Sequence, residues 1–157
     1  MKKLFEIAKK LNQIQIPPSV TIIKKSAFSE CVSLNNVVIP SSVTIIEDFA
    51  FSSCFLLSKI IIHDSVVSIG QYAFSKCMAL TEIDLPPSIT SIENSTFNNR
   101  SSLKKINIPK TVKTIHNNSF PGCNSLNKIS VSSETLICED AFPKHVKVKK
   151  DKPCNIF

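Results

Sequence analysis

The chain has 157 residues, of which 43% are hydrophobic and 20% charged, a balance that indicates one globular domain and excludes a disordered chain. The formal net charge of +7 would suit a nucleic-acid partner, but Arg100 is the sole arginine, Tyr72 the sole tyrosine, and tryptophan is absent. Because base reading and base stacking depend on those side chains, we expect no nucleic-acid partner. The longest largely apolar stretch, residues 55–62, contains Lys59 and is far shorter than the roughly 18 residues of a membrane-spanning helix.

The first fifteen residues, MKKLFEIAKKLNQIQ, carry apolar residues at helical spacing, yet they also match a pattern that recurs along the chain. Phe5 and Leu11 lie 23 residues before Phe28 and Leu34. We therefore predict that residues 1–15 are a half repeat, one or two helical turns long, that caps the array with polar lysines. Because Glu6 interrupts the apolar stretch and no small-residue cleavage site follows, we expect no signal peptide.

Residues 16–130 hold five copies of a 23-residue unit, and the copy at residues 39–61 reads IPSSVTIIEDFAFSSCFLLSKII. Three residue types recur at this spacing. They are Phe28, Phe51, Phe74, Phe97 and Phe120, then Cys31, Cys54, Cys77 and Cys123, and finally Leu34, Leu57, Leu80, Leu103 and Leu126. Such self-similarity is typical of a solenoid, in which each unit buries its apolar face only against its neighbours.

Each unit has three predicted parts. Alternating apolar residues, as in residues 34–39 and 57–62, indicate parallel strands stacked from unit to unit, and prolines such as Pro40 end them. The β-branched segment that follows, for example residues 42–46, predicts a second line of short strands. The AFSxC segment, for example residues 50–54, predicts a single helical turn. We therefore expect a β-rich repeat solenoid whose stacked parallel strands lie about 4.8 Å apart.

Written as LxxIxIPxSVTxIxxxAFxxCxx, the unit resembles the BspA-like class of leucine-rich repeats. One copy matches the class closely, at Ile69, Gly70, Tyr72, Ala73, Phe74, Cys77, Leu80 and Ile83. The other copies replace the glycine of that pattern with Lys24, Glu47, Glu93 and His116. Because none of these is glycine, the turn cannot generally require a positive φ. The resemblance implies a leucine-rich repeat solenoid, and such solenoids present rigid surfaces for protein recognition.

One repeat departs from the cysteine column, because Arg100 takes the cysteine position among Asn98, Asn99, Ser101 and Ser102. Since a guanidinium needs hydration, we expect this turn to open towards solvent. We interpret it as a drifted repeat that its neighbours hold in place, in preference to a landmark for a partner. The cysteines, 23 residues apart, match no zinc-binding spacing, so we expect a buried ladder of reduced thiols and no metal or other cofactor.

Enzyme chemistry finds no support in the sequence. Gly70 and Gly122 are the only glycines, so no glycine-rich loop can cradle a phosphate. No Ser/His/acid or Cys/His set stands apart from the repeat register. We therefore predict a non-enzymatic protein without a small-molecule substrate.

The outward positions of the main strands are where a partner surface is expected. The candidate residues are Asn36, Val38, Lys59, Ile61, Glu82, Asp84, Lys105 and Lys128. Val38 and Ile61 would begin an apolar patch, although single surface apolar residues are ordinary and the lysines also fit a solvated face. The sequence does not identify the protein partner.

Residues 131–143 form a degenerate last repeat in which Phe142 falls one residue short of the register, and residues 144–157 form a polybasic tail. The tail ends in CNIF, which resembles the CaaX box of prenylated proteins, and a terminal phenylalanine favours geranylgeranyl. Asn155 departs from the aliphatic pattern of that box. Cys154 would carry the lipid, and anionic inner-leaflet lipids would attract the lysines. These lysines are Lys144, Lys147, Lys149, Lys150 and Lys152.

We therefore expect a eukaryotic scaffold or adaptor on the cytoplasmic face of the plasma membrane, with an unstructured lysine run that lets the solenoid stand off the bilayer. The alternative is a surface or secreted adhesin-like repeat protein in which the CNIF tail is accidental. Three glycosylation sequons, at Asn94, Asn99 and Asn117, would matter in that case, since N-glycosylation belongs to secreted proteins.

Overall fold

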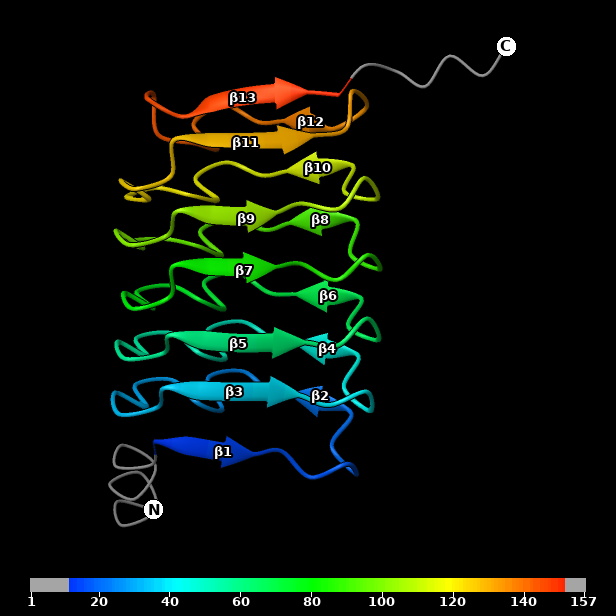
Figure 1. Ribbon diagram of the computed structural model, residues 1–157. Helices are drawn as coiled ribbons and strands as arrows, with labels where there is room; N and C mark the ends of the chain where they lie inside the picture. The colour runs from blue at the N-terminus through cyan, green and yellow to red at the C-terminus, as the bar shows by residue number, and fades with distance from the viewer. Residues whose placement is uncertain (1–11, 152–157) are drawn as a thin grey trace.

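The computed structural model describes residues 12–151, and in this part the chain winds into a stack of coils with β1 at one end and β13 at the other (Figure 1). Each full coil contributes one strand to a main line and a shorter strand to a second line. The main line contains β1 (Gln13–Gln15), β3 (Asn36–Ile39), β5 (Lys59–Ile62), β7 (Glu82–Asp84), β9 (Lys105–Asn107), β11 (Lys128–Val131) and β13 (Lys147–Lys150). The second line contains β2 (Ile22–Ile23), β4 (Ile45–Ile46), β6 (Ser68–Ile69), β8 (Ser91–Ile92), β10 (Thr114–Ile115) and β12 (Leu136–Ile137). The predicted β-solenoid is therefore confirmed.

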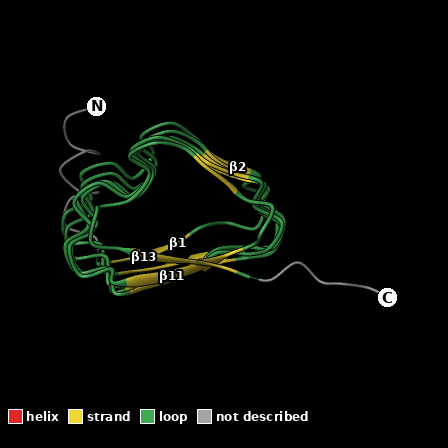
Figure 2. Ribbon diagram, turned by 90° about the horizontal axis from the view of Figure 1, so that it is seen from above, coloured by secondary structure: helices red, strands yellow, loops and turns green. Residues whose placement is uncertain are grey.

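The pairing register keeps equivalent residues of successive coils side by side. All pairs are parallel, and in the main line Val38 lies beside Ile61 while Glu82 lies beside Lys105. Seen from the end of the stack, the coils superpose, with the main strands on one side and β2 on the opposite side (Figure 2). A column read from the sequence is therefore a column in space, except in the shortened last coil, where Lys128 pairs with Lys147.

The third side of each coil is made of turns, and no helix occurs among residues 12–151, so the predicted helical turns are wrong. Phe49 and Ser53 have φ of 58° and 61°, which breaks a right-handed helical turn. Their amides donate to Gln71 and Ser75 carbonyls of the next coil, at 2.9 and 2.8 Å. The intervening amide of Ser52 donates within its own turn instead, to Phe49 at 3.0 Å. Amides along the turn thus donate alternately to the next coil and within their own turn. Successive turns are therefore hydrogen-bonded to one another as strands are, and this gives the buried amides their partners.

Gly70 does not have a positive φ. This agrees with the expectation from the other repeats, in which a non-glycine residue takes its place. A Cβ on Gly70 would instead lie 2.5 Å from Oδ1 of Asp48, whose carboxylate accepts a hydrogen bond from the Gln71 amide at 2.9 Å. The glycine is therefore needed for close approach of two turns. The residues with positive φ lie further along each turn, and Tyr72 and Lys76 are the pair in this coil, at 56° and 58°.

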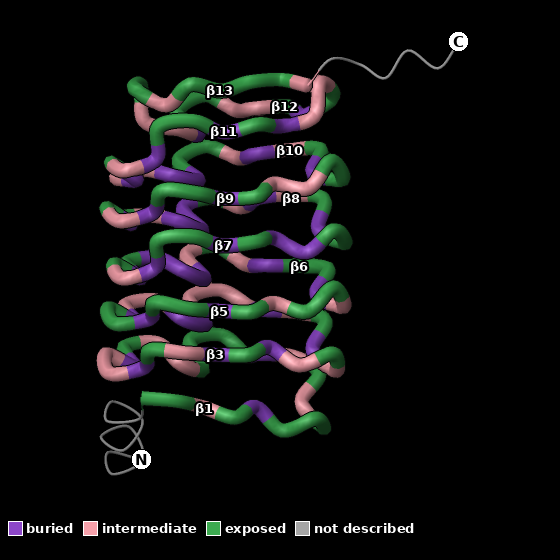
Figure 3. Tube along the Cα trace, in the orientation of Figure 1, coloured by how far each residue is buried: buried purple, intermediate pink, exposed green. Residues whose placement is uncertain are grey.

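Stacked phenylalanine rings run through the core along the turn side. Ring centroids lie 5.7 Å apart from Phe51 to Phe74 and 6.0 Å apart from Phe74 to Phe97, with interplanar angles of 9° and 14°. Phe142 continues the stack 4.7 Å from Phe120 despite its shifted place in the sequence. Burial is greatest in the central coils (Figure 3), where each ring from Phe51 to Phe120 is covered by a ring on either side.

The cysteine column is an interior ladder of free thiols, as predicted. Cys54, Cys77 and Cys123 are fully buried and unpaired. The thiol of Cys77 donates a hydrogen bond to the carbonyl oxygen of Phe51 at 3.2 Å, and Cys54 and Cys123 make the same bond in their own coils. Each thiol therefore satisfies a carbonyl of the preceding turn.

We predict that truncating a central ring is far more costly than truncating a terminal one. Phe74→Ala should lower the free energy of unfolding by about 3–5 kcal/mol, because it leaves a cavity between two stacked rings. Phe28→Ala should cost clearly less, since Phe28 is half-buried and stacks in the described chain on Phe51 alone. Urea unfolding of the two variants measures both effects, and equal losses would contradict stacking as the source of stability.

We also predict that stability falls in alkaline solution as the thiols titrate. Burial raises the pKa of the Cys77 and Cys123 thiols to about 11, against about 8.5 for an unfolded chain. Between these values the unfolded chain releases protons that the folded chain keeps, so the free energy of unfolding decreases as pH rises from about 8.5 to about 11. Lysines titrate nearby, so the control is the Cys77→Ala/Cys123→Ala variant, whose stability should depend less steeply on pH.

Candidate functional site: the outward face of the main strands

The candidate partner residues all lie on the outward face of the main strands. They form two columns, one through Asn36, Lys59, Glu82, Lys105 and Lys128, the other through Val38, Ile61 and Asp84. All are exposed except the half-buried Asn36. The face is built by alternation, because the intervening residues such as Ile60 and Ile106 point into the core.

The N-terminal half of this face carries the exposed apolar pair. Val38 and Ile61 are neighbours in the β3–β5 register and are 57% and 48% exposed. Two β-branched side chains side by side on a rigid sheet form a small contact surface for another protein. The strand that follows, β7, presents Glu82 and Asp84 instead, so the apolar pair is bordered by carboxylates.

The C-terminal half of the face is basic. Lys105, Lys128 and Lys147 continue one column, and Lys149 continues the other after Ser130. Lys147 and Lys149 were predicted to lie in an unstructured run, and that expectation is wrong, because they belong to β13. Val148 of that strand pairs with Ile129 of the inward column but is 39% exposed, because no further coil covers it in the described chain.

The other predicted tail lysines have different places. Lys144 is exposed in the turn before β13, and Lys152 lies outside the described residues, as do Cys154 and the rest of the CNIF segment. Lys150 occupies an inward column beside Val131, and its ammonium donates a hydrogen bond to the Thr135 carbonyl at 2.9 Å. Lys150 therefore helps to close the end of the core, and its ammonium is held there.

Arg100 contradicts the prediction of a turn that opens to solvent. Its side chain is fully buried, and its guanidinium carbon lies 5.1 Å from the centroid of the Phe97 ring. The three guanidinium nitrogens have no hydrogen-bond partner in the described chain. Burial lowers the pKa of Arg100, an effect that Cys77 and Cys123 oppose. The closed turn therefore holds an arginine where the other coils hold a thiol.

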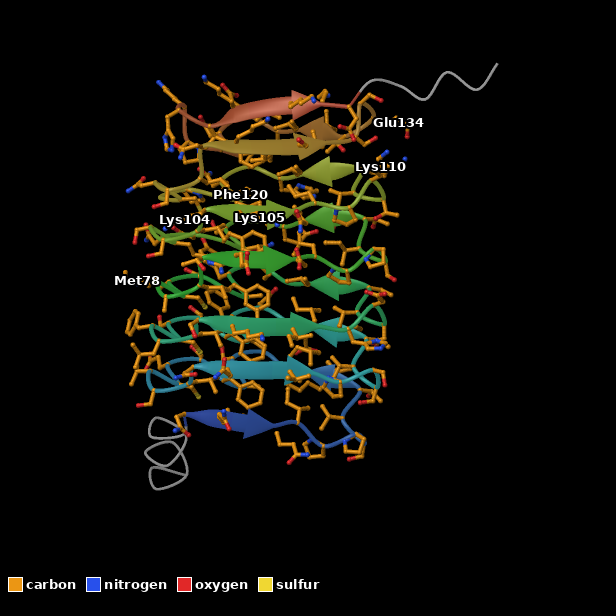
Figure 4. All side chains as sticks on the ribbon, in the orientation of Figure 1. Met78, Lys104, Lys105, Lys110, Phe120 and Glu134 are labelled. Atoms are coloured by element: carbon orange, nitrogen blue, oxygen red, sulfur yellow. The ribbon has the colours of Figure 1, made fainter. Side chains whose placement is uncertain are left out.

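Sequence reasoning missed an apolar ridge at the junction of the turns and the main strands. Phe55, Leu56 and Met78 are 39%, 57% and 44% exposed there. The Ala79 amide donates to the Phe55 carbonyl at 3.2 Å, so the residues come from adjoining coils, and Met78 projects outward (Figure 4). The signal was available, since Phe55 and Met78 occupy equivalent places in successive repeats.

Metal-binding clusters, membrane-spanning helices and surface hollows are the remaining features that could mark a site among the described residues. No cluster of three or more metal-binding side chains occurs within residues 12–151. That part of the chain also contains no helix long and apolar enough to cross a membrane. The hollows on the main face are shallow, and one of about 280 Å³ lies over β9 and β11, lined by Lys105, Asn107, Lys128 and Ser130.

A solenoid with one main and one short strand per coil, and a leucine column in its core, defines a leucine-rich repeat protein. The family model described as BspA type leucine rich repeat region, in six copies, matches residues 1–127 and 44–150. The chain therefore belongs to the BspA-type leucine-rich repeat family. No curated protein matches the sequence.

Solved structures agree with this assignment. A leucine-rich repeat protein from Bacteroides ovatus is 28% identical with a TM-score of 0.76, over 90% of this chain and 43% of that one. A leucine rich repeat protein from T. pallidum is 27% identical with a TM-score of 0.73, over 89% of this chain and 74% of that one. A leucine rich cell surface protein from Faecalibacterium prausnitzii is 29% identical with a TM-score of 0.67, over 91% and 48%. The chain thus spans less than half of the first and third.

We predict that Arg100 destabilises the solenoid. Arg100→Cys restores the column, and Arg100→Met keeps an apolar stem without the charge, so both should raise the free energy of unfolding by roughly 1–4 kcal/mol. Urea unfolding should show a higher midpoint with an unchanged slope. A lower midpoint in both variants would mean that the guanidinium has a stabilising partner.

Proposed function

We propose that the protein is a non-enzymatic interaction scaffold whose outward strand face binds a protein partner. The observation that carries the proposal is the exposed pair Val38 and Ile61, which lie side by side on the paired strands β3 and β5. Every repeated residue has a packing or turn role, so the outward columns are the part of each repeat that is free to vary. The membership in a leucine-rich repeat family supports the same role, since repeat solenoids commonly serve recognition.

We further propose that Cys154 is prenylated and holds the scaffold on the cytoplasmic face of the plasma membrane. CNIF is the residue pattern that supports this, and the reaction requires Phe157 to be the free carboxyl terminus. A single lipid chain binds membranes only reversibly, so a second signal is needed. Basic residues just before the cysteine supply that signal when the leaflet is anionic.

The second candidate function is a cell-surface adhesin. The observation that favours it is the 29% identity to the leucine rich cell surface protein of Faecalibacterium prausnitzii. In that case the CNIF segment is accidental and the sequons at Asn94, Asn99 and Asn117 become acceptors in a eukaryotic secretory route. A mobility shift on treatment with a deglycosylating enzyme would support this candidate and exclude the cytosolic one.

We predict that membrane localisation depends on Cys154. A chain tagged with a fluorescent protein at its N-terminus should label the plasma membrane of a eukaryotic cell, and Cys154→Ser should disperse the label. The intact mass of the wild-type chain should show one prenyl group and the loss of residues 155–157. Equal membrane association of both chains, or an unmodified full-length mass, would refute prenylation.

The scaffold role is tested separately with the Cys154→Ser chain as bait. A partner should be recovered with this chain and lost with Val38→Asp/Ile61→Asp, which places charges on the apolar pair without touching the core. Recovery of the same proteins with both baits would refute the proposed contact surface.

A further inference from the structure

The lysines of the last coils form an ordered, charged surface. We define the lysine face as Lys105, Lys128, Lys147 and Lys149, the outward lysines of β9, β11 and β13. Three of them share one column, in which parallel strands place neighbouring residues about 4.8 Å apart. All four are exposed. Like charges repel one another in such a column, so an anion bound against it would relieve the repulsion.

No carboxylate of the described chain neutralises the charge of the lysine face. No carboxylate of residues 12–151 lies within ion-pair distance of its four ammonium groups. The sequence has no acidic residue between Glu93 and Glu134, although it has five lysines there. The bordering carboxylates are Glu82 and Asp84 on β7, and Asp84 is engaged by the side-chain amide of Asn107.

The face also offers space for an anionic group. The hollow of about 280 Å³ over β9 and β11 lies between Lys105 and Lys128, with the polar side chains of Asn107 and Ser130 beside them. Figure 4 shows Lys104 and Lys105 together at the start of β9, so a further exposed lysine lies next to the face. Two ammonium groups above polar side chains are suited to a phosphate oxygen.

We propose that the lysine face binds the phosphate groups of anionic phospholipids, so that the last coils lie on the membrane. This inference deepens the proposed membrane function and rests on it for the identity of the anion. Cys154 is the third residue after Asp151, a distance of at most about 11 Å in an extended chain, which is comparable to the Debye length. A lipid on Cys154 therefore brings the lysine face against the headgroups and does not let the solenoid stand off.

The charge boundary on the same sheet sets the orientation. Glu82 and Asp84 are repelled by an anionic surface, whereas the lysines that follow are attracted to it. The solenoid therefore tilts with β13 towards the bilayer and β3 away from it. Val38 and Ile61 remain free for a protein partner.

The test compares two variants with the same change in net charge in the prenylated full chain. Lys105→Gln/Lys128→Gln removes two lysines of the face and leaves the tail intact, and Lys76→Gln/Lys110→Gln removes two exposed lysines elsewhere. Binding is measured by sedimentation with phosphatidylcholine vesicles, with and without phosphatidylserine. On phosphatidylserine vesicles the face variant should bind up to about 25-fold more weakly than wild type, since each of the two lysines near an anionic leaflet contributes up to about fivefold. The control variant should bind as wild type does, and salt should reduce the difference.

Other outcomes overturn the inference in distinguishable ways. Equal weakening by both variants would mean that only net charge matters, and no weakening by either would leave the lipid anchor acting without the face. A face variant that loses binding to RNA but not to vesicles would assign the lysines to nucleic acid. The unprenylated Cys154→Ser chain, tested on the same vesicles at low salt, separates the two proposals. If it binds phosphatidylserine through the face while cells show no prenylation, the anchor fails and the lipid-binding face stands.

Discussion

The structure depends on one constraint, which is that each coil can complete its hydrogen bonds and bury its rings only against the coils beside it. Phe51 and Phe74 illustrate it, since each ring is covered by its neighbours in the stack. The turns obey the same rule through amides that alternate between bonds to the next coil and bonds within their own turn. The left-handed backbone conformation of a non-glycine residue such as Ser53 is tolerated because these hydrogen bonds hold it in place.

The same constraint separates structural from functional positions. Inward residues are held to a narrow choice by packing, so the outward columns can change from coil to coil without loss of the fold. The face accordingly passes from apolar at Val38 and Ile61, through acidic at Glu82 and Asp84, to basic from Lys105 onwards. One face of the solenoid therefore offers two chemically different surfaces, which suits a protein that joins a partner to a second surface.

The spacing of Phe51 and its equivalents predicted the solenoid, because a repeated apolar column is buried when the units stack. The alternating and β-branched segments predicted both strand lines and the outward columns. The burial of Arg100 was not predicted, because hydration of the guanidinium was expected to open the turn. The turn is instead held closed by the hydrogen bond from the Asn99 amide to the Pro121 carbonyl at 2.8 Å, which does not involve the side chain of residue 100. The order of Lys147 was missed because the last coil is shorter than the period used to align the repeats. The turns were predicted as helical because a helical turn and the observed turn place the same residues inward. The apolar pattern therefore could not reveal the positive φ of residues such as Phe49.

The alternating amides also govern how such a protein can change in length over evolution. Insertion of one residue into a turn would invert the alternation from that point and leave amides of two coils without partners. Insertion of a whole unit would add one rung to every ladder and alter no existing contact inside a coil. Genetic change therefore favours gain or loss of complete periods. Within the described chain, the shortened last coil resists this kind of growth, because a further unit there would have to displace the hydrogen bond from Lys150 to the Thr135 carbonyl.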